Sequence, residues 1–330
     1  MRSVARPDVT AIDHVLSFAL EHPWAVTPAM RQTVANILAR RLVSRDAAPD
    51  VAALVPRDNL PKPKRGTAAV IPIYGVIAPR MNLLSDFSGG TTFEALSAQL
   101  QGAMADDSIK TIVLDVDSPG GNAAGATEFA RELLQARERK PIVAQAQHTM
   151  ASAAYWVCSC ATEIVASPSA MVGAIGVYTI YDDISDALAS LGVKRELIVA
   201  GKYKAEGADG GPLTDEGREH LRALVDAAYG LFVGDVAKGR SVTVASVRSG
   251  YGQGRIVPAE EALALGLVDR IASLSDTLTR LTATSGARTA LTAHAATGQE
   301  SLPAATTPQE PQALVAASLH YRDALYQLDL

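Results

Sequence analysis

The sequence is poor in cysteine, in aromatic residues and in net charge. Of its 330 residues 2 are cysteine and 5% are aromatic, and 30 basic residues nearly balance 35 acidic ones, for a net charge of −5. A nucleic-acid-binding protein is disfavoured, because such proteins usually carry a basic excess or stripe. Cys158 and Cys160 lack a second pair to complete a metal site, and their spacing does not favour a disulfide, so we expect two small buried thiols in a reducing compartment.

Charge is almost absent from one stretch of the chain. Between Lys140 and Asp182 the only charged residue is Glu163. Glutamine, serine, proline and glycine interrupt this stretch, so it is not the run of about 20 apolar residues that a membrane-spanning helix needs. We expect it to be buried in protein as short strands and small-residue helices, with Glu163 pointing away from any apolar pocket. The polar N-terminus also does not match a signal peptide.

The predicted elements divide the chain into three parts. Residues 1–66 are expected to form a helical appendage, in which two helices flank a turn with Pro23 and Pro28 and a linker begins at residue 46. Residues 67–283 alternate short apolar runs with amphipathic helices, which predicts an α/β core. Residues 284–330 are rich in Ala, Thr and Pro and are expected to be a flexible tail with a terminal helix.

Within the core, the pattern predicts strands that include residues 172–181 and 194–200. A long helix is predicted over 213–240, with Thr214 as its N-cap because acidic residues follow in the first turn.

Three segments combine special backbone demands with reactive side chains. The first, Asp117–Gly121 (DSPGG), follows a strand, and its glycines allow N–H groups to face a ligand, although an ordinary strand-to-helix turn has the same pattern. In the second, Ser152 begins an alanine-rich helix, where serine is either a cap or an unobstructed nucleophile. The third, Gly201–Lys204 (GKYK), contains lysines that are either solvated or, in an apolar pocket, suited to act as a general base.

The order and spacing of these segments resemble the S49 peptidase family. A Gly-x-Ile-Gly-Val segment at 173–177 lies between them, and Lys204 follows Ser152 by 52 residues. The family includes signal peptide peptidase A and phage capsid proteases, and the resemblance covers about residues 67–277. It implies a ClpP/crotonase-like core of repeated β-β-α units.

The resemblance also implies a site. Ser152 matches the family's nucleophile and Lys204 its general base, a Ser-Lys dyad without histidine, metal or cofactor. The backbone N–H groups of Gly120, Gly121 and Ala153 are the expected oxyanion hole, because such donors stabilise the tetrahedral intermediate. Both dyad residues lie on one chain, so the sequence is compatible with a dyad inside one subunit.

The sequence departs from the family pattern at one position. The family often has a second serine in Gly-Ser-x-Gly, which hydrogen-bonds the lysine, whereas Ala174 stands at that position here. Either Ser169 or Thr149 orients the lysine instead, or activity is reduced.

Two other residues compete for the role of base. His148 lies four residues before Ser152, but a histidine at a strand end more often packs or hydrogen-bonds, and the sequence places no obvious aspartate behind it. Lys202 is two positions from Lys204, and only the family match separates the two.

The function expected from the resemblance is that of a serine endopeptidase of the phage or prophage capsid type. It would cleave scaffold or head proteins as a homo-oligomer in the cytoplasm of a bacterial host, at the procapsid, with neither nucleic acid nor a membrane anchor. Alternatives are a signal-peptide-degrading peptidase, a non-catalytic assembly protein, which Ala174 motivates, and a crotonase-like enzyme that binds acyl-CoA.

Overall fold

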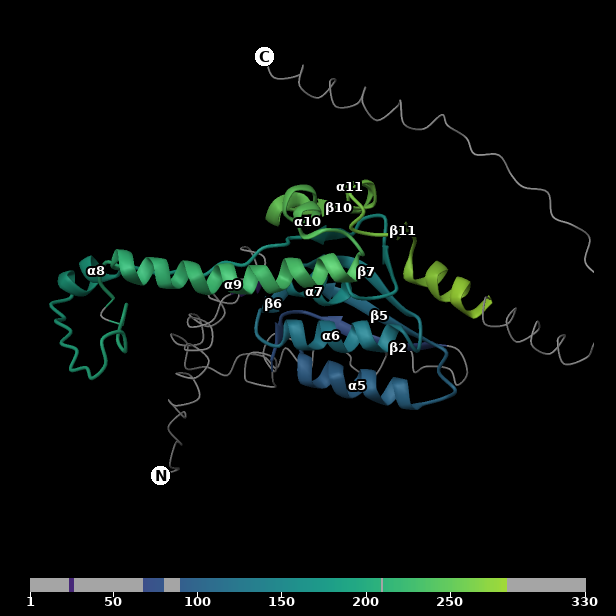
Figure 1. The fold of residues 1–330 in the computed structure, drawn as a ribbon, viewed down its shortest axis with the longest axis horizontal. Coiled ribbons are helices and arrows are strands. Elements are labelled where there is room, and N and C mark those ends of the chain that lie inside the picture. The colour runs from purple at the N-terminus through teal and green to yellow at the C-terminus, as the bar shows by residue number, and fades with distance from the viewer. Residues whose placement is uncertain (1–23, 27–67, 80–89, 209, 284–330) are drawn as a thin grey trace, which may run out of the picture. The chain divides into compact units, whose positions relative to one another are not determined.

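The computed structural model describes residues 24–26, 68–79, 90–208 and 210–283, which Figure 1 draws in colour. The strands are β1 (Trp24–Val26), β2 (Ala68–Tyr74), β3 (Ile77–Ala78), β4 (Thr91–Thr92), β5 (Thr111–Ser118), β6 (Gly120–Asn122), β7 (Ile142–Ala151), β8 (Glu163–Ala166), β9 (Met171–Gly173), β10 (Ile256–Pro258) and β11 (Arg270–Ile271). The helices are α5 (Phe93–Ala105), α6 (Ala126–Arg137), α7 (Ala153–Cys158), α8 (Ser185–Ser190), α9 (Asp215–Gly239), α10 (Val244–Gly250) and α11 (Ala259–Ala264), with a 3₁₀ turn at Gly252–Gly254.

These strands form two sheets. The larger has the order β10-β9-β7-β5-β2, with β8 and β11 joined to it through β7. All its described pairs are parallel except β9 with β10. The smaller sheet has the order β1-β6-β3-β4. The succession β5–β6–α6 is one strand–strand–helix unit, with its two strands in different sheets.

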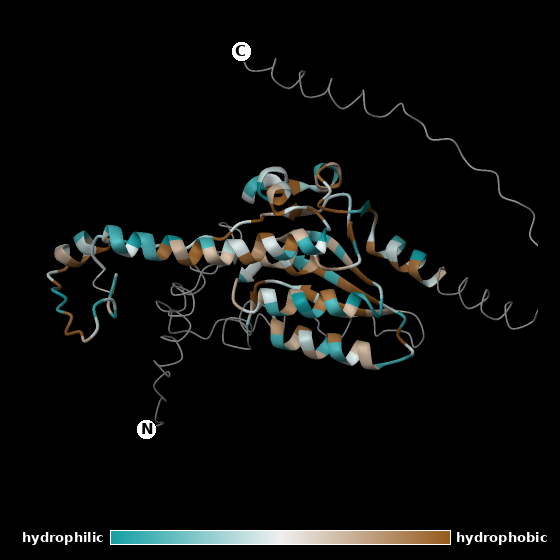
Figure 2. Cartoon of the chain, in the orientation of Figure 1, coloured by the Kyte–Doolittle hydropathy of each residue, from teal (hydrophilic) through white to brown (hydrophobic). Residues whose placement is uncertain are grey.

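The larger sheet is buried under helices. Seven of the eight residues of β5 are buried, as expected for a parallel strand covered on both faces. α6 packs against α5, α7 and α9, and its Phe129 and Leu133 face the core. Figure 2 shows the apolar residues concentrated in the strands beneath these helices. The predicted α/β class is confirmed.

α9 is anchored to this core by its second half only. Thr214 caps it as predicted, because its hydroxyl accepts a hydrogen bond from the first turn. Near the other end, Phe232 stacks on Trp156 of α7 with ring centroids 4.5 Å apart. The buried carboxylate of Asp235 accepts hydrogen bonds from the Trp156 indole N–H and the Thr127 hydroxyl, so one acidic group ties α9 to both α6 and α7.

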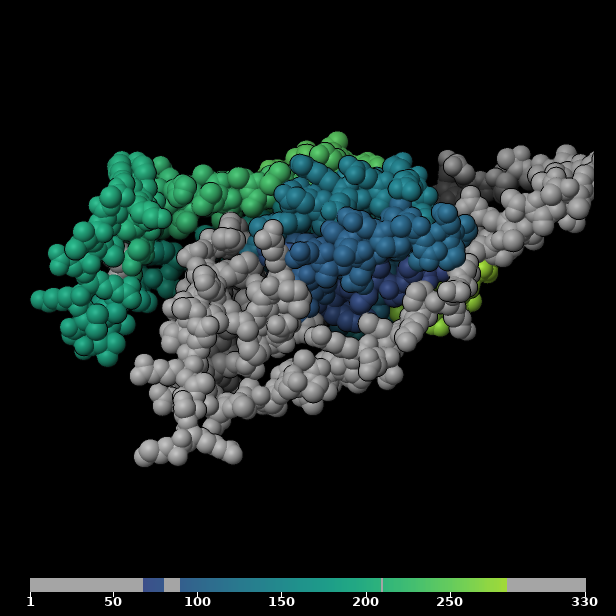
Figure 3. Space-filling model, turned by 90° about the horizontal axis from the view of Figure 1, so that it is seen from below, coloured from purple at the N-terminus to yellow at the C-terminus, as the bar shows by residue number. Residues whose placement is uncertain are grey.

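The first half of α9 belongs to an arm, which we define as residues 178–208 and 210–230. The arm carries α8 and projects away from the sheets (Figures 1 and 3). The strands predicted at 172–181 and 194–200 are wrong in this region: β9 ends at Gly173, and residues 194–200 form neither helix nor strand. Residues 194–200 pair with no described strand, and Ile198 is left 97% exposed.

The turn predicted between the two N-terminal helices is also wrong in part, because Trp24–Val26 is strand β1. The predicted helices that flank it, the linker and the tail beyond residue 283 lie outside the described residues. In the part of the chain that is described, no helix is both long enough and apolar enough to cross a membrane.

Candidate active site

Ser152 lies at a strained elbow between β7 and α7. Its backbone has φ 55° and ψ −121°, and it is one of only four described non-glycine residues with a positive φ. The Ser152 N–H donates to the Gly173 carbonyl and the Ser152 carbonyl accepts from the Trp156 N–H, each at 2.8 Å, so the surroundings hold the strain in place. A strained strand-to-helix turn of this kind presents a nucleophile at the end of a sheet.

The Ser152 side chain is not a helix cap. It accepts no bond from the first turn of α7, and its hydroxyl has no hydrogen-bond partner among the described residues. The next N–H, that of Ala153, likewise has no described acceptor. The Ser152 hydroxyl, which has no partner, therefore lies beside the Ala153 N–H, which has none either. Ser152 itself is 98% buried.

The glycines of the DSPGG segment lie at the same edge of the sheet as Ser152. Ser118 of β5 is paired with Met150 of β7, and Gly120 and Ser152 each follow by two residues. Gly120 has φ 102°, which favours glycine, and its N–H contacts the Ser118 hydroxyl at a long 3.2 Å. The structure therefore brings the predicted oxyanion donors and the predicted nucleophile to one edge.

Gly121 is required for a different reason. A Cβ on it would lie 1.9 Å from the carbonyl oxygen of Ile77, so the approach of β6 to β3 excludes any side chain. Gly121 is thus needed because β6 lies so close to β3, which fixes the position of the neighbouring Gly120, and not because its own backbone has a positive φ.

His148 has an aspartate behind it, contrary to the sequence interpretation. Its Nδ1 lies 3.2 Å from Oδ2 of Asp117, while Oδ1 of Asp117 accepts from the Thr149 N–H at 3.1 Å. His148 is nevertheless exposed, and four residues of extended strand place its Cα about 13 Å from that of Ser152. That separation is too long for direct proton transfer, so the pair holds the DSPGG turn against the end of β7.

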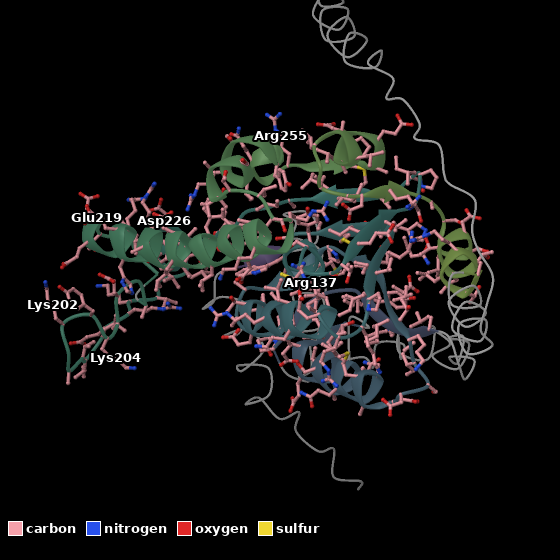
Figure 4. All side chains as sticks on the ribbon, turned by 45° about the vertical axis from the view of Figure 1, so that its right-hand side comes forward. Arg137, Lys202, Lys204, Glu219, Asp226 and Arg255 are labelled. Carbon is pink, nitrogen blue, oxygen red and sulfur yellow. The ribbon has the colours of Figure 1, made fainter. Side chains whose placement is uncertain are left out.

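The structure does not bring Lys204 to Ser152 within one chain. Lys204 lies on the arm, far from the sheets (Figure 4), and is exposed rather than enclosed by the charge-poor stretch. A dyad inside one subunit, with which the sequence was compatible, is not formed here. The reason is the orientation of α9, which carries residues 201–208 outward with the arm.

The two lysines of the arm differ in their partners. The Tyr203 hydroxyl, at 2.6 Å, and the Glu216 carboxylate, at 3.1 Å, hold the ammonium of Lys202 and raise its pKa. The ammonium of Lys204 has no hydrogen-bond or ion-pair partner among the described residues. Of this pair, Lys202 is fixed in its charged form, and Lys204 is available to another surface.

The predicted lysine orienters lie in the body of the molecule. Thr149 is half-buried at the end of β7 and Ser169 is exposed after β8. Ala174, at the position of the family's second serine, has φ 55°, and its N–H donates to the Arg255 carbonyl at 2.8 Å. Neither hydroxyl contacts a lysine of the described residues.

The charge-poor stretch behaves as expected around Ser152. Glu163 pairs with Arg270 at 3.1 Å and Arg280 at 2.6 Å, and its register partner is Val143, near the start of β7 and therefore far from the elbow. Cys158 and Cys160 are free and buried, as predicted. Burial raises the pKa of both thiols, that of Cys160 to about 12, so neither is a competing nucleophile.

Sequence reasoning missed two features of the site. One is the contact of Asp117 with His148 and Thr149, for which the only signal was an aspartate directly before SPGG. The other is β1, whose residues follow Pro23 and were assigned to a turn; its pairing with β6 connects segments almost 100 residues apart, which no local pattern reveals.

Residues 135–288 match the family model described as Peptidase family S49. This part of the chain is similar to peptidase family S49. The range matched to the S49 model contains Ser152, Ala174 and Lys204, while the DSPGG segment precedes it.

Curated relatives extend the similarity beyond that range. The Head-tail preconnector protein GP5 of Enterobacteria phage P21 is 31% identical over 210 residues, which cover 64% of this chain and 42% of that protein. The Capsid assembly protease C of Escherichia phage lambda is 29% identical over 286 residues, covering 81% of this chain and 65% of that one. Protease 4 of Salmonella typhi is 30% identical over 225 residues, covering 65% and 34%. This chain thus spans less than two thirds of the length of each.

Proposed function

We propose that the chain is a serine endopeptidase with Ser152 as nucleophile and Lys204 as general base. The observation that carries the proposal is the elbow at Ser152, where strained backbone presents an unpartnered hydroxyl next to the N–H of Ala153 and the end of the DSPGG segment. A chain with this geometry has the nucleophile and the oxyanion donors that acyl transfer needs, and Lys204 would supply the base.

The reaction proceeds in two halves. The lysine amine takes the Ser152 proton as Oγ attacks a peptide carbonyl, and the N–H groups of Gly120 and Ala153 stabilise the resulting oxyanion. The ammonium then gives its proton to the departing amine, and water releases the acyl group by the reverse sequence. Each oxyanion donor contributes about 3–4 kcal/mol to such a step.

The lysine is supplied by a neighbouring subunit. A lysine accepts a proton only after its ammonium has lost one, which apolar surroundings favour and water opposes. The surface of the arm offers no such surroundings, whereas the charge-poor residues around Ser152 do. A second copy that places its arm over this body brings Lys204 to Ser152, with Thr149 or Ser169 as orienting hydroxyl, and makes the active form a homo-oligomer.

The substrates are proteins of an assembling phage or prophage head, in the cytoplasm of the bacterial host. The similarity to the lambda Capsid assembly protease C and to the P21 Head-tail preconnector protein GP5 supports this choice. A signal-peptide-degrading activity is the outcome to expect if head proteins are not cleaved.

The proposal is tested by co-expressing the chain with the scaffold and major head proteins of the phage or prophage that encodes it and following their cleavage by mass spectrometry. Ser152→Ala and Lys204→Ala should each abolish cleavage without changing the far-ultraviolet circular dichroism. Lys202→Ala is the matched control and should retain cleavage, because its ammonium is held by Glu216. Cleavage that persists in both dyad variants rules out the dyad.

Mixing the two inactive variants tests where the lysine comes from. Co-expressed Ser152→Ala and Lys204→Ala chains, carrying different tags, should recover about a quarter of wild-type activity, because some interfaces join an intact body to an intact arm. A dyad within one chain predicts no recovery at any mixing ratio.

A further inference from the structure

β1 lies on the strand that carries the proposed oxyanion glycine. Trp24, Ala25 and Val26 pair antiparallel with Asn122, Gly121 and Gly120 in that order. The chain therefore runs along β6 toward Gly120 and reaches it at Val26.

The edge of β6 is suited to binding an extended peptide. On one side β6 pairs with β3, and among the described strands its other side is occupied by β1 alone. Without β1 that side would present free N–H and C=O groups, which pair with an added strand of almost any sequence. β6 also packs against α7, which begins directly after Ser152, so a strand on this edge passes the nucleophile.

We infer that residues 24–26 occupy the substrate-binding edge of β6, so that the chain blocks its own peptide site until β1 is displaced. The inference rests on the proposed function, because a substrate must place a carbonyl next to Ser152 and Gly120. A substrate strand in the register of β1 does so at the residue opposite Gly120, which is the place of Val26.

β1 is suited to reversible occupancy rather than to a permanent role in the sheet. It has three residues, pairs with no other described strand, and is separated from β2 by residues 27–67. A short pairing of this kind is weak by itself. Its persistence comes from tethering, which gives an attached segment an effective concentration near the millimolar range.

The test uses the full chain with Ser152→Ala, so that binding is measured without cleavage. The probe is a fluorescein-labelled peptide with the sequence of residues 20–30, LEHPWAVTPAM. Ala25→Pro and Val26→Pro are made separately, because successive N–H groups on a strand point to opposite edges and one of the two prolines removes a bond to β6. Ala25→Ser and Val26→Thr are the matched controls, which keep the N–H and the approximate size.

At least one proline variant should bind the peptide about tenfold more tightly than its control, as measured by fluorescence anisotropy, because the tethered competitor is lost. Equal affinities in all four variants overturn the inference. Hydrogen exchange on the Ser152→Ala chain, which needs no change in β1, gives a second measurement. Saturating peptide should expose the amides of residues 24–26 while those of 120–122 stay protected, and continued protection of 24–26 overturns the inference.

Failure of the proposed peptidase function can be distinguished from failure of the inference that β1 occupies the edge of β6. With Ser152 intact, the proline variants should cleave a quenched-fluorescence form of the peptide faster than the controls. If no variant cleaves but the binding difference remains, the peptidase proposal fails and the occupancy of β6 stands. If cleavage is equal and binding is equal, only the occupancy fails.

Discussion

At the scale of single residues, the candidate site depends on backbone shape more than on side chains. Ser152 has an unusual φ and ψ, Gly120 has positive φ, and Gly121 has no room for a Cβ. The sequence revealed these positions through a motif, because glycine pairs and a serine among alanines are visible in it. It did not reveal the strain at Ser152, which arises only when β7, α7 and Gly173 meet.

The close approach at Gly121 gives a prediction about stability. Gly121→Ala places a methyl group 1.9 Å from the Ile77 carbonyl, and we expect a loss of about 2–3 kcal/mol as β3 and β6 separate. Gly102→Ala in α5 is the matched control, because nothing lies within 4 Å of its added Cβ, and it should stabilise by about 0.5–1 kcal/mol. Thermal unfolding measures both, and equal effects would contradict the contact at Ile77.

At the scale of elements, sequence patterns located the buried strands and the amphipathic helices well. The helix predicted over 213–240 corresponds to α9, with Thr214 as its cap, because periodicity and capping are local signals. The strand predicted at 194–200 is wrong because a strand needs a partner, and the apolar residues 197–200 have none among the described strands. If residues 194–200 paired with a strand of a second copy, they would form the strand that the sequence predicts.

α9 offers a comparison of glycines within one helix. Gly239→Ala would bring a Cβ to 2.3 Å from the Ser159 carbonyl, where α9 meets the end of α7, and should lower stability by about 2 kcal/mol. Gly230→Ala and Gly234→Ala meet nothing within 4 Å and should stabilise by up to about 1 kcal/mol. Urea unfolding of the three variants is the measurement, and a stabilised Gly239→Ala would mean that the two helices do not pack as described.

At the scale of the whole molecule, the described residues form a packed body and an arm. Several large apolar side chains of the arm are exposed. Leu191 is 75% and Ile198 97% exposed on the arm, and Figure 2 shows apolar residues in its loop. Exposed apolar residues in such number are typical of a surface that another protein covers. Neither the direction of the arm nor its separation from Ser152 is encoded in a local pattern, and for that reason the sequence alone left the dyad inside one chain open.

The arm therefore gives a prediction about assembly. Ile198→Asp should shift the chain toward monomer in sedimentation velocity and reduce cleavage at least about tenfold, while thermal stability of the body stays within about 0.5 kcal/mol because the residue is exposed. Leu263→Asp, at a 41% exposed position on α11 of the body, is the control and should leave assembly unchanged. Intact oligomers in Ile198→Asp would move the interface away from this part of the arm.

The distance between Ser152 and the arm lysine has a kinetic consequence. If each site is shared by two chains, specific activity falls on dilution, and the rate at low concentration rises with a power of protein concentration greater than one. Chains that are scarce are then inactive, and hydrolysis begins only where copies are crowded together. The onset of proteolysis would then depend on the local concentration of the chain.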